Sequence, residues 1–290
     1  MTDRRPSGAG ALDAANLYCA GLARAHARDQ WLAALYADKS ARDALFALAS
    51  FDHEIRQALK RARSPTLAAI RLAWWREVVS GERREEAAGN PVALAVLAAI
   101  DAYALPHAWL EAMLDARLKE IAPERDFDLA LFRAFAEESD GARLKLAARI
   151  AANGQDLDPA EAHGPAGMAL ALTGVLKELP FKAGSAPTLI PADIAARHGA
   201  SMADFDARRS SARVIAACAE LRSLAREELA EAERRLRNSA PAILPAFVPL
   251  APLRLDLDRL DRNANRPFDP AAEASPLQRQ WAIWRWARTR

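Results

Sequence analysis

Helical periodicity runs through almost the whole chain and limits its fold more than any other feature. Apolar residues, many of them alanine, recur at spacings of three and four, and no alternating run marks a β-strand. Single prolines and glycines interrupt the pattern without forming long linkers. The sequence therefore predicts an all-α protein with helices at about 12–29, 30–37, 40–63, 65–80, 91–103, 106–120, 126–152, 165–178, 208–238, 241–260 and 276–288.

The length and composition favour one large domain. The chain has 290 residues, of which 51% are hydrophobic and 27% charged, so it can bury a substantial core. We expect a short flexible N-terminus at residues 1–10 and a single helical domain over residues 11–290. The interior segments expected to lack regular structure are residues 180–187 and 261–276.

Charge and cysteine usage exclude several classes of function. A formal net charge of +2 gives no overall electrostatic case for nucleic-acid binding. Cys19 and Cys218 lie far apart on predicted helices, so we expect small core residues and neither a disulfide framework nor a zinc site. No secretory signal follows residues 1–10, and no apolar window suits a membrane span. We expect a cytoplasmic protein, with peripheral contact at the inner membrane face left open.

Residues 44–57 (ALFALASFDHEIRQ) bring polar side chains into an otherwise apolar helix. At about 100° per residue, one stripe is apolar and consists of Ala41, Leu45, Leu48, Ile55 and Leu59. A second line, which we expect to face a cleft, consists of Phe46, Ala49, Ser50, His53 and Gln57. Asp52 and Glu54 are nearby but offset by one residue. His53 could bind a polar ligand together with Glu54 and Gln57, or be an ordinary surface or core histidine.

Residues 166–199 (AGMALALTGVLKELPFKAGSAPTLIPADIAARHG) form a second segment with an unusual helix face. Small residues and one carboxylate share that face: Gly167, Ala171, Gly174 and Glu178. Glycine inside a helix costs about 0.5–1 kcal/mol of stability relative to alanine, so we expect Gly174 to serve packing or ligand binding. We favour close packing of a neighbouring helix over a roomier cleft. Lys177 and Lys182 add positive charge beside Glu178, either for an anion or as an ordinary charged helix end.

Together these two segments resemble the two metal-motif helices of squalene and phytoene synthases. Further similarity lies at residues 29–42 (DQWLAALYADKSAR), 70–77 (IRLAWWRE) and 90–110 (NPVALAVLAAIDAYALPHAWL). The resemblance implies an isoprenoid-synthase-type helical bundle, with the two motif helices antiparallel across a central cleft. The chain departs from the family's pattern at the motif positions, where Arg is replaced by Ser50, the two first-motif Asp by His53 and Gln57, Gln by Ala171, Asn by Gly174, and the two second-motif acids by Glu178 and Lys182.

A shorter branch of that family, found in alphaproteobacteria and mitochondria, resembles the chain more closely. Residues 173–180 (TGVLKELP) fit its second motif. The mitochondrial member of the branch is regarded as an assembly factor for respiratory complex I. The resemblance therefore implies a non-catalytic binding or assembly factor, with a respiratory-complex subunit as partner and a lipid or prenyl-diphosphate-like ligand in the cleft, contacted by Lys182.

The alternative is an active prenyl transferase that joins two prenyl diphosphates head to head. Enzymes of the family ionise an allylic diphosphate with Mg²⁺ ions, which need carboxylate oxygens on both facing helices. Only rearranged carboxylates such as Asp52, Glu54 and Glu178 could supply them here. Under the first interpretation we expect no cofactor, and Mg²⁺ enters only under the alternative.

Tryptophans mark two further candidate surfaces. Trp74 and Trp75 are adjacent on a helix and point about 100° apart, so we expect one in the core and the other either lining the cleft or contacting another element. The last predicted helix places Leu277, Trp281 and Trp284 on one face among arginines. That face could rest on an anionic membrane surface or dock onto the bundle, and the sequence leaves both open.

Overall fold

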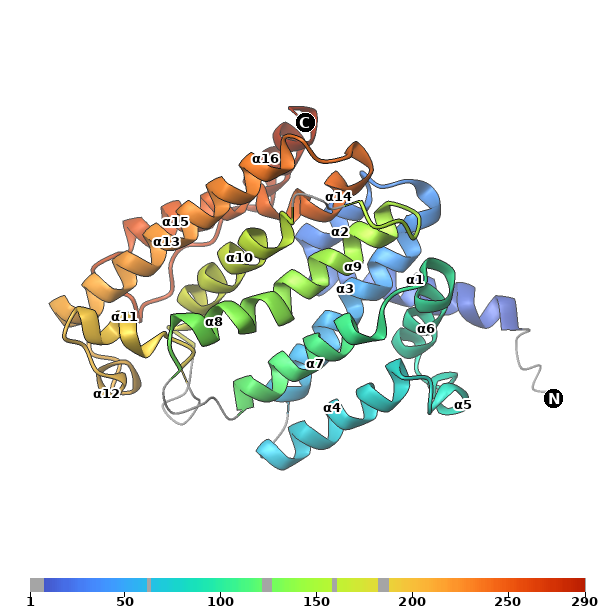
Figure 1. Cartoon of the computed structure of the whole chain (residues 1–290), viewed down its shortest axis with the longest axis horizontal. Coiled ribbons are helices and arrows are strands. Elements are labelled where there is room, and N and C mark those ends of the chain that lie inside the picture. The colour runs from blue at the N-terminus through green and yellow to red at the C-terminus, as the bar shows by residue number, and fades with distance from the viewer. Residues whose placement is uncertain (1–7, 62–63, 122–126, 158–160, 182–187, 290) are drawn as a thin grey trace.

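The computed structural model describes residues 8–61, 64–121, 127–157, 161–181 and 188–289 (Figure 1). Regular structure in these residues is helical, and they contain no β-strand, which confirms the all-α prediction. No helix within the described ranges is both long and apolar enough to cross a membrane. The division into residues 1–10 and a single domain stays a prediction.

The N-terminal half of the bundle runs from α1 to α9 and includes one π-helical turn. Its elements are α1 (Gly8–His26), α2 (Arg28–Ala34), α3 (Lys39–Lys60), α4 (Pro65–Val79), α5 (Arg84–Ala87), α6 (Pro91–Tyr103), α7 (His107–Ile121), α8 (Leu129–Ala136), the π-helical turn η1 (Glu137–Gly141) and α9 (Ala142–Ala151).

The C-terminal half begins with the second motif helix. Its elements are α10 (His163–Glu178), α11 (Ala192–Arg197), α12 (Met202–Asp206), α13 (Ala212–Leu236), the 3₁₀ turn η2 (Pro241–Ile243), α14 (Leu244–Phe247), the 3₁₀ turn η3 (Val248–Leu250), α15 (Leu253–Arg262) and α16 (Pro276–Arg288).

Capped prolines begin several of these helices. Ser64 accepts a hydrogen bond from the amide of Leu67, and Asn90 accepts bonds from two amides of the first turn of α6. Ser275 forms a reciprocal capping box with Gln278 at the start of α16. In all three cases proline follows the cap, where its missing N–H group costs nothing. Prolines expected to interrupt the periodicity thus mark helix starts.

Two predicted helices are interrupted in the structure, and three short helices were not predicted. The helix expected over residues 126–152 is two α-helices joined by η1. The helix expected over residues 241–260 is short helical turns as far as residue 250, because Pro245, Pro249 and Pro252 cannot donate to a helical ladder, and a regular helix, α15, begins only at Leu253. The short helices α5, α11 and α12 were not predicted, since they are too brief to show periodicity. Residues 263–275 are irregular, as expected. Of the loop predicted at residues 180–187, residues 180 and 181 form a turn, and residues 182–187 lie outside the described ranges.

Helix α3 occupies the middle of the bundle. It packs against α1, α2, α6 and α9, while α10 packs against α13 and η1. In Figure 1, α13 and α15 run along one edge of the molecule and α4 runs along another. The apolar core extends through both halves and contains both cysteines, which are buried and unpaired, as the sequence predicted.

Two glycines of α10 lie in very different surroundings. A Cβ atom at Gly167 would be 2.6 Å from the backbone nitrogen of Gly141, so α10 and the π-helical turn approach as closely as glycine allows. A Cβ atom at Gly174 would meet nothing within 4 Å. The close packing that we expected at Gly174 is therefore wrong there, and occurs instead two turns earlier.

This contrast gives a matched pair of substitutions. Gly167→Ala should lower the free energy of unfolding by about 1–3 kcal/mol, because two backbones must separate. Gly174→Ala should leave it unchanged or raise it by up to about 1 kcal/mol, because alanine is the better helix former and has room. Urea denaturation of both variants measures the difference. Equal effects of the two substitutions would contradict this packing.

Candidate functional site

A cavity of about 570 Å³ lies between α3 and α10. Helix α3 contributes Asp52 and His53 to its lining, and α10 contributes Gly174 and Lys177. The remaining walls include residues of α1, α2, α7, α8, η1, α9, η3, α15, α16 and the segment before α16. The two segments singled out in the sequence thus meet around one central space.

The two motif helices run in the same direction along this cavity. Lys60, the last residue of α3, forms an ion pair with Glu178, the last residue of α10, at 3.4 Å. The carboxyl ends of both helices therefore lie together. The antiparallel arrangement that we expected is wrong.

The face of α3 that lines the cavity is rotated from the predicted one. Ala49, Asp52, His53 and Arg56 are its lining residues. Three predicted cleft residues do not belong to this lining: Phe46, Ser50 and Gln57. The hydroxyl of the buried Ser50 donates to the backbone carbonyl of Cys19 at 3.0 Å.

Phe46, Glu54 and Gln57 have other surroundings, whereas the predicted residues Asp52 and His53 do line the cavity. Phe46 is buried and stacks on Trp31, with ring centroids 6.4 Å apart. Glu54 and Gln57 are half-buried and do not line the cavity. Because α3 is packed on several sides, its apolar stripe does not by itself identify which remaining face adjoins the cavity.

Neither Trp74 nor Trp75 lines the central cavity. Trp75 is buried and packs edge-on against Phe51 at 5.2 Å, and the two tryptophans contact each other at 4.9 Å. Helix α4 packs on the outer side of α3 and α7. The alternative in which one tryptophan of this pair lines the cleft is wrong, because their helix lies one layer away from it.

Four predicted residues of α10 do line the cavity: Ala171, Gly174, Lys177 and Glu178. The first two are the positions where the resemblance predicts that Gln and Asn have been replaced, so their small side chains leave space. Lys182 lies outside the described residues.

The carboxylates on the α3 side are held by guanidinium groups of the protein itself. Arg56 contacts both oxygens of Asp52 at 2.9 and 3.0 Å and reaches Asp140 of η1 at 3.2 Å. Arg143 of α9 contacts Asp140 at 3.0 Å and lies 3.9 Å from Asp52. Arg56 therefore bridges two carboxylates from different helices, in the manner of a cation bound between them.

A further ion pair, between Arg117 and Glu120, lies near this cluster of carboxylates and arginines. Arg117 of α7 is 2% exposed, pairs with Glu120, and its guanidinium carbon lies 5.5 Å from the ring centroid of Phe135. Burial lowers the pKa of Arg117, although nearby carboxylates oppose that effect. Burial alone would raise the pKa of Asp140, but Arg56 and the other two arginines outweigh it and hold that pKa below its usual value.

A second cluster closes the opposite wall. Asp256 of α15 accepts from Lys177 at 3.0 Å and from Arg279 of α16 at 2.6 Å. Arg279 also contacts both oxygens of Asp29 on α2, at 3.1 and 3.2 Å. The C-terminal helix is thereby tied to the cavity wall through two carboxylates.

A pair of stacked histidines lies in the same lining. The rings of His26 and His53 are 4.5 Å apart and inclined by 14°. Burial lowers the pKa of His53, and a positive charge on His26 would lower it further. The Nε2 atom of His53 is buried and makes no hydrogen bond to the described residues. His53 is therefore a neutral imidazole near pH 7.

This arrangement is poorly suited to hard metal ions. Mg²⁺ is usually bound by carboxylates, waters and substrate phosphates, and a neighbouring guanidinium or ammonium repels it. In the described part of the chain, no group of three or more His, Cys, Asp or Glu side chains is placed to hold a metal ion. The carboxylates that line the cavity on α3 and α15 already have cationic partners.

Sequence reasoning missed the residues that neutralise the site. Arg56 could have been found, since it lies one turn after Asp52 on the same helix face. Asp140 gave no such signal, because its position depends on the π-helical turn. Arg279 approaches Asp29 across 250 residues of sequence, and neither residue stands in a recognisable motif.

An all-α bundle with two motif helices around a central cavity defines an isoprenoid-synthase-type protein. The family model described as squalene/phytoene synthase matches residues 23–285, and the chain belongs to this family. The resemblance inferred from the two motif segments is confirmed.

Two mammalian relatives are named as assembly factors and not as synthases. The chain is 25% identical over 275 residues to the mouse protein "NADH dehydrogenase (ubiquinone) complex I, assembly factor 6", covering 93% of this chain and 82% of the relative. The human protein of the same name is 24% identical over 272 residues, covering 92% and 81%.

Solved structures share the fold at low sequence identity. A dehydrosqualene synthase in complex with ligand has a TM-score of 0.81 at 12% identity, with 98% of both chains covered. Squalene synthase HpnC from Alicyclobacillus acidocaldarius has a TM-score of 0.70 at 16% identity, covering 91% of this chain and 100% of that one. These matches confirm the fold class.

Removing the bridging arginine tests the charge assignment. Arg56→Met leaves Asp52 and Asp140 without the cation between them, and should lower the free energy of unfolding at neutral pH by about 2–3 kcal/mol. The loss is below that of a fully buried pair because the Arg56 side chain is 34% exposed.

The stability difference between the wild type and Arg56→Met should depend on pH. In the wild type Asp140 has a lowered pKa, so its contribution to stability is lost as pH falls below about 4. In the variant Asp140 loses one of the cations that lower its pKa, so that pKa rises, protonation becomes easier, and the stability deficit should shrink as pH falls from about 7 to 4. Arg84→Met, which removes an exposed pair with Asp101, is the control and should change little. A deficit independent of pH would contradict the assignment.

Proposed function

We propose that this chain is a catalytically inactive member of the squalene/phytoene synthase family that acts as a binding or assembly factor in the maturation of respiratory complex I. The observation that carries the proposal is the occupation of its cavity carboxylates by Arg56, Arg143, Lys177 and Arg279. The names of the mouse and human relatives support the assembly role.

The physical argument concerns competition for the carboxylates. A Mg²⁺ ion entering between Asp52 and Asp140 would have to displace Arg56, which is covalently attached and contacts both groups. The displaced guanidinium would then remain beside the metal ion and repel it. The same holds for Asp256, which has two cationic partners. A binding role needs the cavity but not the metal.

An active prenyl transferase is the second candidate, and one observation favours it. Asp52 and Glu178 both line the cavity, so two of the three rearranged carboxylates adjoin the space where a diphosphate would lie. Glu54 does not line it, and Glu178 is half-exposed and paired with Lys60. Mg²⁺ would be the cofactor under this alternative, as it is for enzymes of the family.

Ligand and location follow from the same proposal. The cavity ligand would be a lipid or prenyl-diphosphate-like molecule, and a respiratory-complex subunit would be the protein partner. The chain would act in the cytoplasm at the inner face of an energy-transducing membrane.

Purified protein and a deletion strain together test the function. With farnesyl or geranylgeranyl diphosphate and Mg²⁺ we expect no pyrophosphate release and no Mg²⁺-dependent rise in melting temperature. Deleting the gene in its native organism should reduce respiratory NADH oxidation, and a Glu178→Ala copy should restore it. Pyrophosphate release abolished by Glu178→Ala, or normal respiration with missing terpenoids, would reverse the ranking.

The outer face of α16 supports membrane contact. Ile283 and Trp286 are buried against the bundle, whereas Leu277 and Trp281 are 77% and 60% exposed. Trp281 and Trp284 stack at 4.7 Å, and the guanidinium carbon of Arg288 lies 4.7 Å from the Trp284 ring. One face of the helix thus docks, and the opposite face offers tryptophan and arginine, the combination suited to an anionic lipid surface.

Vesicle sedimentation tests this contact. The wild type should bind vesicles rich in phosphatidylglycerol, with binding that falls as salt rises, because arginines attract the surface. The double substitution Trp281→Ser and Trp284→Ser should weaken binding about tenfold. The matched control removes exposed apolar residues of α4, Leu67→Ser with Ile70→Ser, and should bind like the wild type. Equal loss in both double variants would exclude α16 as the contact.

A further inference from the structure

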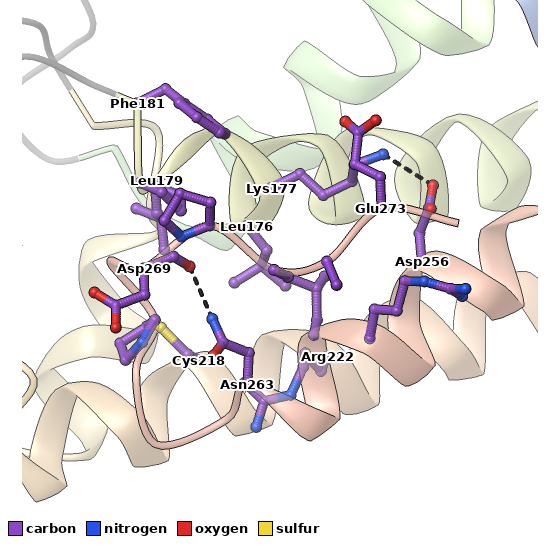
Figure 2. A pocket seen from close by; sticks show the side chains of 17 residues that line it. Leu176, Lys177, Leu179, Phe181, Cys218, Arg222, Asp256, Asn263, Asp269 and Glu273 are labelled. Atoms are coloured by element: carbon purple, nitrogen blue, oxygen red, sulfur yellow. Dashed lines mark hydrogen bonds and ion pairs between the residues drawn. The ribbon is translucent and has the colours of Figure 1, made fainter. Parts of the chain in front are cut away.

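A second, smaller pocket lies beyond the carboxyl end of α10. Its volume is about 200 Å³, and its walls come from α10, α13, α15 and the irregular segment 263–275. In Figure 2, Leu176 lies in the middle, with the Lys177–Asp256 pair on one side and Phe181 on the other. The central cavity adjoins it, because both are lined by Lys177, Asp256 and Glu273.

The floor of this pocket is apolar. Leu176 and Leu179 are each 3% exposed, and Cys218 is fully buried. Burial raises the pKa of the Cys218 thiol to about 11, so this side chain is uncharged and acts as a small apolar wall. Water in such a space has few hydrogen-bonding partners, which favours an apolar occupant.

The rim offers cationic groups near this floor. Arg259 lies one turn after Asp256 on α15 and donates to the Leu255 carbonyl and to the side chain of Gln278. It has no carboxylate partner among the described residues. Lys177 holds Asp256, but Asp256 is also held by Arg279 at 2.6 Å. Lys177 can therefore turn to a ligand without leaving a buried carboxylate unpaired.

We propose that this pocket binds an anionic amphiphile, with a short apolar chain on the floor of Leu176, Leu179 and Cys218 and a carboxylate or phosphate head at Arg259 and Lys177. At about 30 Å³ for each water-sized unit, the volume takes an apolar group of about seven non-hydrogen atoms. Glu273 and Asp269 also line the pocket and oppose an anion, but both are exposed, so solvent and salt screen their charges. This site goes beyond the proposed function. It shares Lys177 with the central cavity, whereas Arg259, Leu179 and Cys218 line this pocket and not the central cavity.

Binding of octanoate, octyl phosphate and octanol to the full chain tests the proposal. By isothermal titration calorimetry, octanoate or octyl phosphate should bind with a dissociation constant on the order of 1 mM. Octanol, which lacks the charge, should bind at least about tenfold more weakly. Tighter binding of octyl phosphate would identify a phosphate head, and tighter binding of octanoate a carboxylate head.

Four variants distinguish this pocket from other sites. Ala271→Phe, which fills the pocket from its irregular wall, should abolish binding, and Arg259→Gln should weaken it about tenfold. Glu273→Gln should strengthen it or leave it unchanged. Arg254→Gln, on the same helix but paired with Glu233 on α13, is the control and should bind like the wild type.

The outcomes separate this site from the proposed function. Helical circular dichroism identifies any variant that fails to fold, and Arg259→Gln decides the question if Ala271→Phe does. No binding of either anion, or unchanged binding in both Ala271→Phe and Arg259→Gln, would overturn the proposal. Neither result bears on respiration in the deletion strain or on pyrophosphate release, which test the central cavity separately.

Discussion

The structure around the cavity depends on one requirement: buried carboxylates need compensating charge. Asp52 and Asp140 come from different helices and are largely removed from water, where two unpaired negative charges would cost several kcal/mol. In a metal-dependent site of this kind, divalent cations supply the compensation. Here Arg56 and Arg143 supply it from within the chain. The helices can therefore keep their spacing around an open cavity without a bound ion.

The same requirement accounts for the position of the C-terminal helix. Asp256 and Asp29 face the cavity from separate helices, and Arg279 pairs with both. A helix far along the sequence is thus fixed to the cavity wall by charge as well as by the apolar contacts of Ile283 and Trp286. Because Arg279 pairs with Asp256, Lys177 can leave this carboxylate without exposing an uncompensated negative charge. Lys177 can therefore bind a ligand while Arg279 continues to stabilise the fold.

Long helices could be predicted from the sequence because their periodicity is strong, and capped prolines mark the starts of α4, α6 and α16. The lining face of α3 could not, because that helix is buried on several sides and its polar residues include one, Ser50, that serves only a backbone carbonyl. Asp140 was also beyond prediction. It reaches Arg56 across 84 residues through a π-helical turn, and a one-residue change of helical phase has no compositional signature.

Gly167 and Gly174 show why a small-residue pattern alone does not decide between packing and space. They lie two turns apart on one face of α10, yet Gly167 contacts the backbone of η1 and Gly174 faces the cavity. The difference comes from where the neighbouring chain passes, which is a property of the whole bundle. Where α10 meets the cavity, the resemblance places Ala171 and Gly174 at positions of Gln and Asn in the family, so polar groups are lost while room is gained. A cavity that keeps its room but pairs its carboxylates internally is suited to holding a molecule, and poorly suited to ionising a diphosphate, which needs metal ions at those same oxygens.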